Sequence, residues 1–307
     1  MQLAPVRGED AFPLVPRHRL HGLELGPFQS VRRGAGSDTA GSRGYLPGDD
    51  VRTIDWGASA RLSAARGTDE FVVRERYAEQ APRVVAVVDR RPAMGLYAPP
   101  WLSKSAVVDR AVDLIGESAF AARGLMGTLG IDADGEADWQ PPTGDVRQWR
   151  AGGRAASLDA PADNVALALG RLYDARALPA GSFVFVLSDF LAPPPVEDWI
   201  AAVGRGWDVV PVVVQDPLWE ASFPEDVGGL VLPVADPGTG AIAPVRLTRQ
   251  EASARRHENE RRRAALLEGF GELGLDWVEL AEEDPDDVLS CFLMWAAART
   301  APIGRVA

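Results

Sequence analysis

The stretches RVVAVVD (83–89) and SFVFVLSD (182–189) decide the fold. Each is a run of β-branched and aromatic residues that ends in an aspartate, which is typical of a strand buried on both faces of a sheet. A third run, DVVPVVV (208–214), has the same character, although Pro211 is unusual inside a strand. Apolar residues at helical spacing lie between these runs, over residues 103–123, 163–178 and 196–204. This alternation predicts an α/β fold with a doubly wound, mainly parallel sheet.

The pattern differs on either side of these runs. After the third run, we expect a hairpin over residues 230–247, a long Arg/Glu-rich helix over 248–274, a strand over 275–280 and a final helix over 285–299. Before the first run, short alternating stretches at 24–28 and 70–75 predict strands, and the Gly-rich stretch 34–44 predicts a loop. We therefore expect two domains. Residues 1–80 form a β-rich N-terminal segment, and residues 81–307 form the α/β domain with its C-terminal hairpin-plus-helix extension.

The composition is that of an ordinary globular protein, with 46% hydrophobic and 25% charged residues. The net charge of −12 lies in residues 81–307, because residues 1–80 hold 11 basic and 11 acidic side chains. An acidic balance argues against nucleic acid as a partner, since phosphate binding needs a basic face. A single cysteine excludes an internal disulfide and a multi-cysteine metal site.

Several motifs of catalysis and membrane insertion are missing from the sequence. It contains no G-x-x-x-x-G-K-[ST] loop, no G-x-G-x-x-G after a strand, no G-x-S-x-G and no H-E-x-x-H. It also lacks a signal-peptide pattern and any run of about 18 apolar residues. We therefore expect no catalytic residues, no cofactor and no membrane insertion, and a cytoplasmic location.

Two strand-terminal acids, Asp89 and Asp189, form the first candidate site. In a doubly wound sheet, ligands bind outside the carboxyl ends of the strands. Carboxylates placed there are natural ligands for Mg²⁺. Alternatively, each aspartate caps the loop that follows it, because Asp favours turns.

The second candidate is the segment GSRGYLPGDDVRTIDWGASARL (41–62), in which arginines alternate with aspartates around a Pro-Gly turn. One hypothesis is an Arg–Asp network that docks the front segment onto the body, and the other is a recognition surface. The residues that define the motif are Arg43, Tyr45, Pro47, Gly48, Asp49, Asp50, Arg52, Asp55, Trp56 and Arg61.

This segment resembles the signature of the domain of unknown function 58 family, a Tyr-x-Pro-Gly-Asp-Asp-x-Arg-x-Ile-x-Trp run followed by Ala-Arg. The resemblance implies a von Willebrand factor A-like α/β domain. It also implies a partnership with AAA+ ATPases of the MoxR type, in which the family member is an adaptor in complex assembly or maturation. A client protein would be a further partner.

The sequence departs from the metal site that this resemblance implies. A von Willebrand-type site begins with D-x-S-x-S, whereas here Asp89 is followed by Arg91 and Ala93 at the two serine positions. The threonine of a later loop, expected near residues 162–164, is also missing, and Asp189 remains as the far acid. Because Arg91 could pair directly with Asp89 or Asp189, we predict a degenerate site that binds no metal.

We therefore expect a non-catalytic protein-binding adaptor. The alternatives are a purely structural assembly partner without an ATPase and a Mg²⁺-dependent hydrolase, for which no nucleophile–base pair is evident. Partner contacts are expected in the loops at the carboxyl ends of the strands, through Tyr97, Trp101, Phe190 and Leu191. Alternatively, Tyr97 and Trp101 cover the first helix of the α/β domain.

Overall fold

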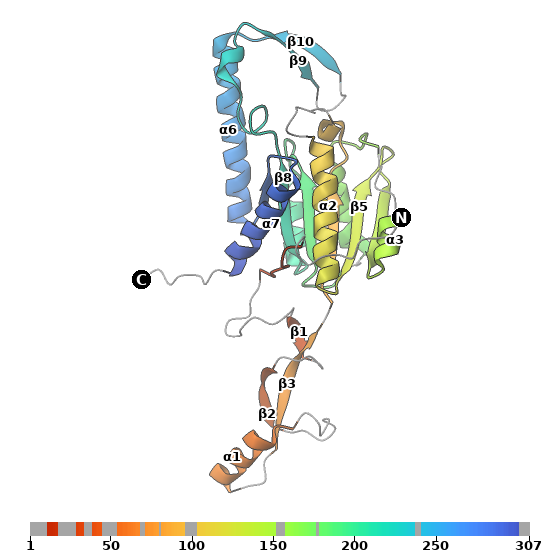
Figure 1. The fold of residues 1–307 in the computed structure, drawn as a ribbon, viewed down its shortest axis with the longest axis vertical. Coiled ribbons are helices and arrows are strands. Elements are labelled where there is room, and N and C mark those ends of the chain that lie inside the picture. The colour runs from red at the N-terminus through yellow and green to blue at the C-terminus, as the bar shows by residue number, and fades with distance from the viewer. Residues whose placement is uncertain are drawn as a thin grey trace, which may run out of the picture. The chain divides into compact units, whose positions relative to one another are not determined.

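Six strands form the central sheet of the computed structural model, in the order β11-β8-β7-β4-β5-β6. Two of them, β8 and β5, are labelled in Figure 1. All neighbouring pairs are parallel except β5 and β6, which are antiparallel. The chain runs outward in one direction from β4 and in the other from β7, so the predicted doubly wound, mainly parallel sheet is confirmed. The strands are β4 (Arg83–Val88), β5 (Leu125–Ile131), β6 (Ala137–Thr143), β7 (Phe183–Ser188), β8 (Asp208–Val214) and β11 (Val278–Leu280).

The structure describes residues 11–17, 29–33, 39–44, 54–67, 71–79, 81–95, 103–151, 157–175, 178–236 and 241–300.

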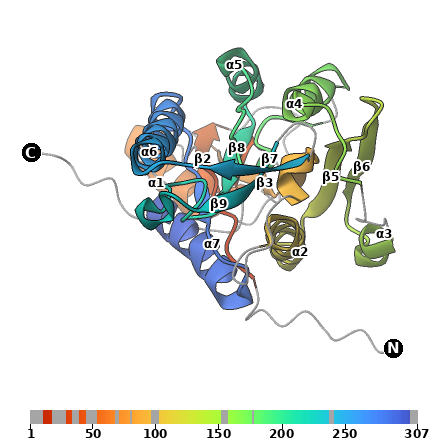
Figure 2. The same cartoon turned by 90° about the horizontal axis from the view of Figure 1, so that it is seen from above.

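Helices cover both faces of the sheet. Viewed from above, α4 and α5 lie on one side of the strands, and α2 and α7 lie on the other (Figure 2). The helices are α2 (Lys104–Ala121), α3 (Val146–Ala151), α4 (Asn164–Ala175), α5 (Val196–Gly204), α6 (Arg249–Glu272) and α7 (Pro285–Thr300). Five of these six helices match the predicted helical stretches, and α3 was not predicted.

The central strands are apolar throughout because each face has its own core. Val184 and Val186 of β7 belong to one core cluster with Trp199 of α5 and Phe270 of α6. Phe185, between the two valines, points to the opposite face and packs against Phe292 of α7, with ring centroids 6.2 Å apart. Successive side chains of a strand point to opposite faces, so a strand between two helical layers has no polar positions.

Residues 11–17 pack in this body, which corrects the predicted domain boundaries. The chain divides into a unit of His18–Ala81 and a second unit that joins residues up to Arg17 with Pro82–Ala307. Phe12 is 2% exposed and stacks on Phe292 at a centroid distance of 4.6 Å. Its backbone N–H donates to Ser118 Oγ at 3.0 Å. The prediction placed these residues with the front segment because a short apolar stretch carries no periodic signal.

The described residues of the unit His18–Ala81 form a three-stranded antiparallel sheet, β1-β3-β2, and one helix. Its elements are β1 (Gln29–Arg33), β2 (Thr39–Gly44), α1 (Trp56–Arg66) and β3 (Val72–Glu79). The strand predicted at 70–75 is present as β3, and the strand predicted at 24–28 lies outside the described residues. The loop predicted over 34–44 is wrong for 39–44, because backbone pairing with β3 makes a strand of this Gly-containing segment.

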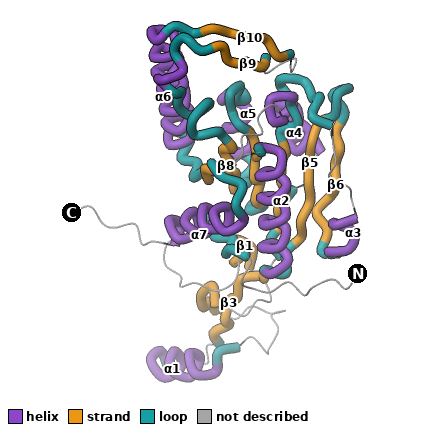
Figure 3. Tube along the Cα trace, turned by 45° about the horizontal axis from the view of Figure 1, so that its top comes forward, coloured by secondary structure: helices purple, strands orange, loops and turns teal. Residues whose placement is uncertain are grey.

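The predicted C-terminal extension is confirmed. Strands β9 (Val231–Ala235) and β10 (Ile242–Arg246) form a separate antiparallel hairpin that joins the N-terminal end of α6 (Figure 3). Thr248 and Glu251 form a capping box that starts α6. Over the described parts of the chain, no helix has the length and apolar character needed to cross a membrane.

Candidate functional site

The two strand-terminal acids lie side by side at the point where the sheet reverses its winding direction. Asp89 follows β4 and Asp189 follows β7, and these strands are direct neighbours. The side chains are almost inaccessible to solvent, with Asp89 1% and Asp189 0% exposed. A ligand site of a doubly wound sheet is expected at this switch point. The prediction that both acids share one edge of the sheet is therefore confirmed.

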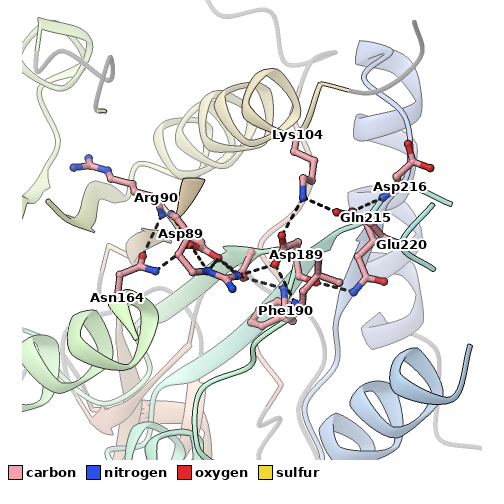
Figure 4. Close-up of polar contacts among 12 residues, drawn as sticks. Asp89, Arg90, Lys104, Asn164, Asp189, Phe190, Gln215, Asp216 and Glu220 are labelled. Atoms are coloured by element: carbon pink, nitrogen blue, oxygen red, sulfur yellow. Dashed lines mark hydrogen bonds and ion pairs between the residues drawn. The ribbon is translucent and has the colours of Figure 1, made fainter. Parts of the chain in front are cut away.

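Arg91 bridges the two carboxylates, whose residues, Asp89 and Asp189, are labelled in Figure 4. Its Nη2 is 2.5 Å from Asp89 Oδ2 and 2.7 Å from Asp189 Oδ1. Its Nε lies 3.0 Å from both carboxylate oxygens of Asp89. The chain then enters the short 3-10 helix η3 (Pro92–Gly95), in which Ala93 is buried. The ion pair that the sequence analysis raised as the alternative to a metal is thus present.

Lys104, the first residue of α2, extends the pairing on the other side of Asp189. Its Nζ lies 3.0 Å from Asp189 Oδ2 and 2.7 Å from Glu220 Oε1. The Lys104 side chain is 1% exposed and that of Glu220 is 7% exposed. Acidic and basic side chains therefore alternate in one buried series of contacts, which we call the ion-pair network. Its members, in order of contact, are Asp89, Arg91, Asp189, Lys104 and Glu220.

Neutral side chains satisfy the remaining polar atoms of the two aspartates. Ser188 Oγ donates to Asp89 Oδ2 at 2.6 Å, and Asn164 Nδ2 donates to Asp89 Oδ1 at 3.0 Å. The backbone carbonyl of Asp189 accepts a hydrogen bond of 2.6 Å from Gln215 Nε2. Asn164 lies in the stretch 162–164, where a threonine was expected. It also accepts a hydrogen bond from the backbone N–H of Arg90 at 3.1 Å, so it holds the loop after β4 in place.

The network sets the protonation of its members. Burial alone would raise the pKa of Asp89, but hydrogen bonds and charge attraction from Arg91 lower it below its ordinary value. Burial would lower the pKa of Lys104, yet Asp189 and Glu220 raise it. For Glu220, burial and the nearby Asp189 raise the pKa despite Lys104. At neutral pH the network therefore contains two cations, Arg91 and Lys104, among three acidic side chains, Asp89, Asp189 and Glu220.

The donor set does not fit a divalent cation. Mg²⁺ needs an octahedral set of oxygen ligands, and here a guanidinium and an alanine stand at the positions of two expected hydroxyls. The described residues contain no group of three or more His, Cys, Asp or Glu side chains arranged to hold a metal ion. Arg91 and Lys104 already occupy oxygens of the carboxylates that would face the ion. That the protein binds no metal remains a prediction.

Within the described residues, the hydroxyl that contacts the network is held in a hydrogen bond. This hydroxyl belongs to Ser188, which is 1% exposed and donates a hydrogen bond to Asp89, a carboxylate whose pKa is lowered. An effective nucleophile needs access to substrate and a base ready to take its proton. The arrangement is suited to rigid support of the loops after β4 and β7.

The prediction for Phe190 as a partner contact is wrong. Phe190 is 1% exposed and packs against Trp199 and Phe270, with centroid distances of 5.8 and 5.5 Å. Its φ of 48° is a left-handed conformation, which turns the chain inward while its N–H donates to Ser188 Oγ at 2.9 Å. Leu191 is half-buried, and its N–H donates to Asp189. Tyr97 and Trp101 lie outside the described residues.

Only part of the signature motif lies within the described residues. Six motif residues lie outside them: Tyr45, Pro47, Gly48, Asp49, Asp50 and Arg52. Arg43 lies in strand β2. Asp55 is the N-cap of α1 and accepts a hydrogen bond of 3.0 Å from Ala58 N. Trp56 is 63% exposed and meets Phe71 edge-on at 6.0 Å, and Arg61 is also exposed. Docking by the motif and recognition by the motif both remain predictions.

Sequence reasoning missed Lys104, Asn164 and Glu220. One signal was available, because Lys104 is the only lysine in a chain whose other basic residues, histidines aside, are all arginines. Its compact ammonium donates to two carboxylates at once, those of Asp189 and Glu220. Asn164 and Glu220 carry no comparable signal.

Comparison with known proteins places the chain among uncharacterised relatives. "Uncharacterized protein Rv1480" of Mycobacterium tuberculosis and "Uncharacterized protein Mb1516" of Mycobacterium bovis are each 28% identical over 230 residues, which is 73% of this chain and 69% of the relative. Among solved structures, BatB from Bacteroides thetaiotaomicron aligns with a TM-score of 0.37 and 14% identity over 70% of this chain and 99% of that chain. An aerotolerance-related membrane protein from Bacteroides fragilis aligns with a TM-score of 0.43 and 12% identity over 71% and 99%.

The family comparison covers most of the chain. The family described as "Protein of unknown function DUF58" matches residues 41–265. The match includes the segment 41–62 and both strand-terminal acids, so it spans parts of both structural units. This chain is a member of the DUF58 family.

Proposed function

We propose that this chain is a non-catalytic, protein-binding adaptor built on a von Willebrand factor A-like domain with a degenerate metal site. The observation that carries the proposal is the position of Arg91, whose guanidinium bridges Asp89 and Asp189 at the switch point of the sheet. A buried ion pair in place of an accessible site favours binding through the surrounding loops over chemistry at their base. The doubly wound sheet with acids after β4 and β7 is consistent with the von Willebrand factor A-like arrangement.

The proposed partner is an AAA+ ATPase of the MoxR type, with a client protein as a further partner, in a cytoplasmic complex that is assembled or matured. This part rests on the family resemblance. The charge of −12 supports a basic partner surface, because complementary charge steers association.

The surface proposed for the partner is the strand-end edge of the sheet. The loop after β7 leads directly into α5, where Val196 and Ile200 are 49% and 56% exposed. These two residues are four positions apart on a helix and therefore share a face. Together with Leu191 at the start of the loop, they take the place that was predicted for Phe190. Tyr97 and Trp101 remain predicted contacts.

The test is a binding measurement between this protein and a MoxR-type ATPase from the same genome. The double variant Val196→Ser/Ile200→Ser should weaken binding by at least about tenfold. The matched control is Leu293→Ser/Met294→Ser on α7, which removes another exposed apolar pair, 41% and 65% exposed, from the other side of the sheet. Tyr97→Ser/Trp101→Ser should weaken binding similarly.

Failure of the ATPase to bind wild-type protein would overturn the proposed partner. Equal losses in the α5 and α7 variants, or none in either, would overturn the proposed surface. Each variant is first checked for a native circular-dichroism spectrum, so that loss of binding is not confused with loss of the fold.

A further inference from the structure

The hairpin of β9 and β10 presents an apolar face to solvent. Val231 lies opposite Arg246, and Pro233 lies opposite Pro244. Opposite residues of a sheet share a face, and so do residues two positions apart on one strand, which adds Ile242. We call these five residues the outer face. Val231 is 62% exposed, Ile242 is 71% exposed, and both prolines are exposed.

The other face of the hairpin holds it to the body. Leu232 packs against the small core cluster that contains Phe223, Val227 and Ala252 of α6. Because neighbouring side chains of a strand point to opposite faces, the outer face is directed away from this cluster. The hairpin is thus anchored through one face while the other stays accessible.

Prolines close the two free edges of the hairpin. Pro233 and Pro244 are the central residues of their five-residue strands and stand opposite each other. A hydrogen-bonded antiparallel pair exchanges two N–H···O bonds, and proline has no N–H. The main-chain groups of this pair therefore point outward, and each edge lacks a donor at its middle. Addition of a partner strand is disfavoured at both edges, which leaves the outer face for recognition.

The charges around the outer face differ from those of the whole chain, whose net charge is −12. Arg246 is the charged residue among the ten of the two strands, and its Nε donates to the Gly229 carbonyl at 3.1 Å. Arg249, at the start of α6, is exposed at the same end, and the neighbouring Glu251 is engaged in the capping box. Asp236 lies at the opposite end, after β9. An occupant should therefore be apolar with an acidic flank towards α6.

The hairpin lies on the side of the sheet where the carboxyl ends of the strands lie. Figures 1 and 2 show it extending from the N-terminal end of α6 across these strand ends. The outer face is therefore on the same side as the edge proposed for the partner.

We propose that the outer face of the hairpin docks an amphipathic helix of a partner protein. The proposal rests on the proposed function only in that the chain binds a protein. A strand of five residues spans about 17 Å at about 3.4 Å per residue, which is the length of about 11 helical residues. A helix about 10 Å wide covers both strands, which lie about 5 Å apart, and presents one apolar stripe to them.

The size of the hairpin argues against a second copy of this chain as the occupant. A stable interface between folded proteins takes about 20–30 residues on each side, whereas the two strands together have ten. A short helical segment needs no larger surface than the hairpin provides.

The direct test is fluorescence anisotropy of labelled peptides with the full-length protein. The probe is a helical peptide of about 11–14 residues with leucines at i, i+3, i+4 and i+7 and glutamates beside this stripe. One control has the same composition in scrambled order, a second has lysines in place of the glutamates, and a third is an extended peptide of alternating valine and threonine. The probe should bind saturably and at least about tenfold more tightly than the scrambled peptide. It should also bind more tightly than the lysine peptide, whereas unspecific attraction to a chain of charge −12 would favour lysine.

Variants locate the binding. Val231→Ser/Ile242→Ser should weaken binding of the probe by at least about tenfold. The matched control is Leu293→Ser/Met294→Ser on α7, which removes a similarly exposed apolar pair and should leave binding unchanged. Arg246→Gln should reduce the preference for glutamates over lysines. All the replaced side chains are exposed, and a native circular-dichroism spectrum confirms that each variant is folded.

Equal affinities for the probe and the scrambled peptide would overturn the helix assignment, and so would binding of the extended peptide. Equal losses in the hairpin and α7 variants would overturn the outer face as the site. Dimerisation in sedimentation that Val231→Ser/Ile242→Ser abolishes would assign the face to a second copy instead. These measurements do not involve the ATPase, so failure of the hairpin site and failure of the proposed partner are distinguishable.

Discussion

Replacement of Arg91 by methionine should destabilise the protein by about 3 kcal/mol. Breaking a buried ion pair by removing one partner costs about 3–5 kcal/mol, because the remaining charge is left without compensation. Arg91, Asp89 and Asp189 are at most 5% exposed, so this range applies. The lower end is expected because Asp189 keeps Lys104, and Asp89 keeps three neutral hydrogen-bond donors, which are Ser188 Oγ, Asn164 Nδ2 and the backbone N–H of residue 91.

The adjacent arginine provides the control. Arg90 Nη2 lies 2.7 Å from Asp138 Oδ2, but the Asp138 side chain is 50% exposed. Pairs of this kind contribute about 0–1 kcal/mol, so Arg90→Met should have a small effect. Both variants keep a long apolar side chain and differ mainly in the charge pair that they remove.

The assay is urea unfolding at pH 7, followed by circular dichroism, with the midpoint and slope compared to wild type. The dependence on pH gives a second readout. Without Arg91, burial should raise the pKa of Asp89 above its unfolded value. The penalty in Arg91→Met is then present above that raised pKa and shrinks as the pH falls through it, because the carboxyl becomes neutral. In wild type, the pKa of Asp89 is lowered instead of raised. Ionised Asp89 therefore stabilises the folded protein at neutral pH, and this stabilisation is lost as the pH falls below about 4.

A loss below about 1 kcal/mol in Arg91→Met, equal to that of Arg90→Met, would refute the reasoning. It would mean that the two aspartates are solvated or protonated in the folded protein and need no cation. A penalty that does not change with pH would refute the assignment of the loss to buried carboxylates.

Three further outcomes are expected. Calorimetric titration of wild type with Mg²⁺ or Mn²⁺ should give no saturable binding, whereas micromolar binding that Asp89→Ala abolishes would contradict the degenerate site. Lys104→Met should lower stability by about 3 kcal/mol at pH 7 in urea unfolding. On the alkaline side, the difference from wild type should shrink above about pH 10.4, as wild-type Lys104 loses its charge at its raised pKa, and a difference that stays constant there would contradict this role. Trp56→Ala should cost only about 0.5–1.5 kcal/mol, as for loss of an aromatic pair with Phe71; a thermal unfolding shift equivalent to about 3–5 kcal/mol would indicate a buried anchor instead.

The sheet was predictable because its strands are buried on both faces. A run such as RVVAVVD has no polar position, so period and composition together identify it. Strand β6 was missed for the opposite reason. Its sequence, ADWQPPT, contains two prolines that disfavour a strand, and the structure tolerates them because β6 pairs with β5 alone at the edge of the sheet.

The site was predictable only in part. The predicted order of the sheet brings Asp89 and Asp189 together. The contact between Asp89 and Arg91 follows from local sequence, because an arginine two positions after an acid can turn back onto it. Lys104 and Glu220 contribute from segments 116 residues apart, and nothing local marks such a pairing. Phe190 was assigned to the surface because the left-handed conformation that turns it inward is rare for a non-glycine residue.

The burial of the only lysine has a consequence for chemical labelling. Reagents that acylate amines require a deprotonated, accessible nitrogen, and Lys104 Nζ is buried, charged and hydrogen-bonded to two carboxylates. Acylation at this position therefore requires opening of the core around α2, so its rate under native conditions reports the population of the open state when opening is fast. A single modified peptide in a mass spectrum would then measure the local stability of the switch point, with no competing lysine signal from the surface.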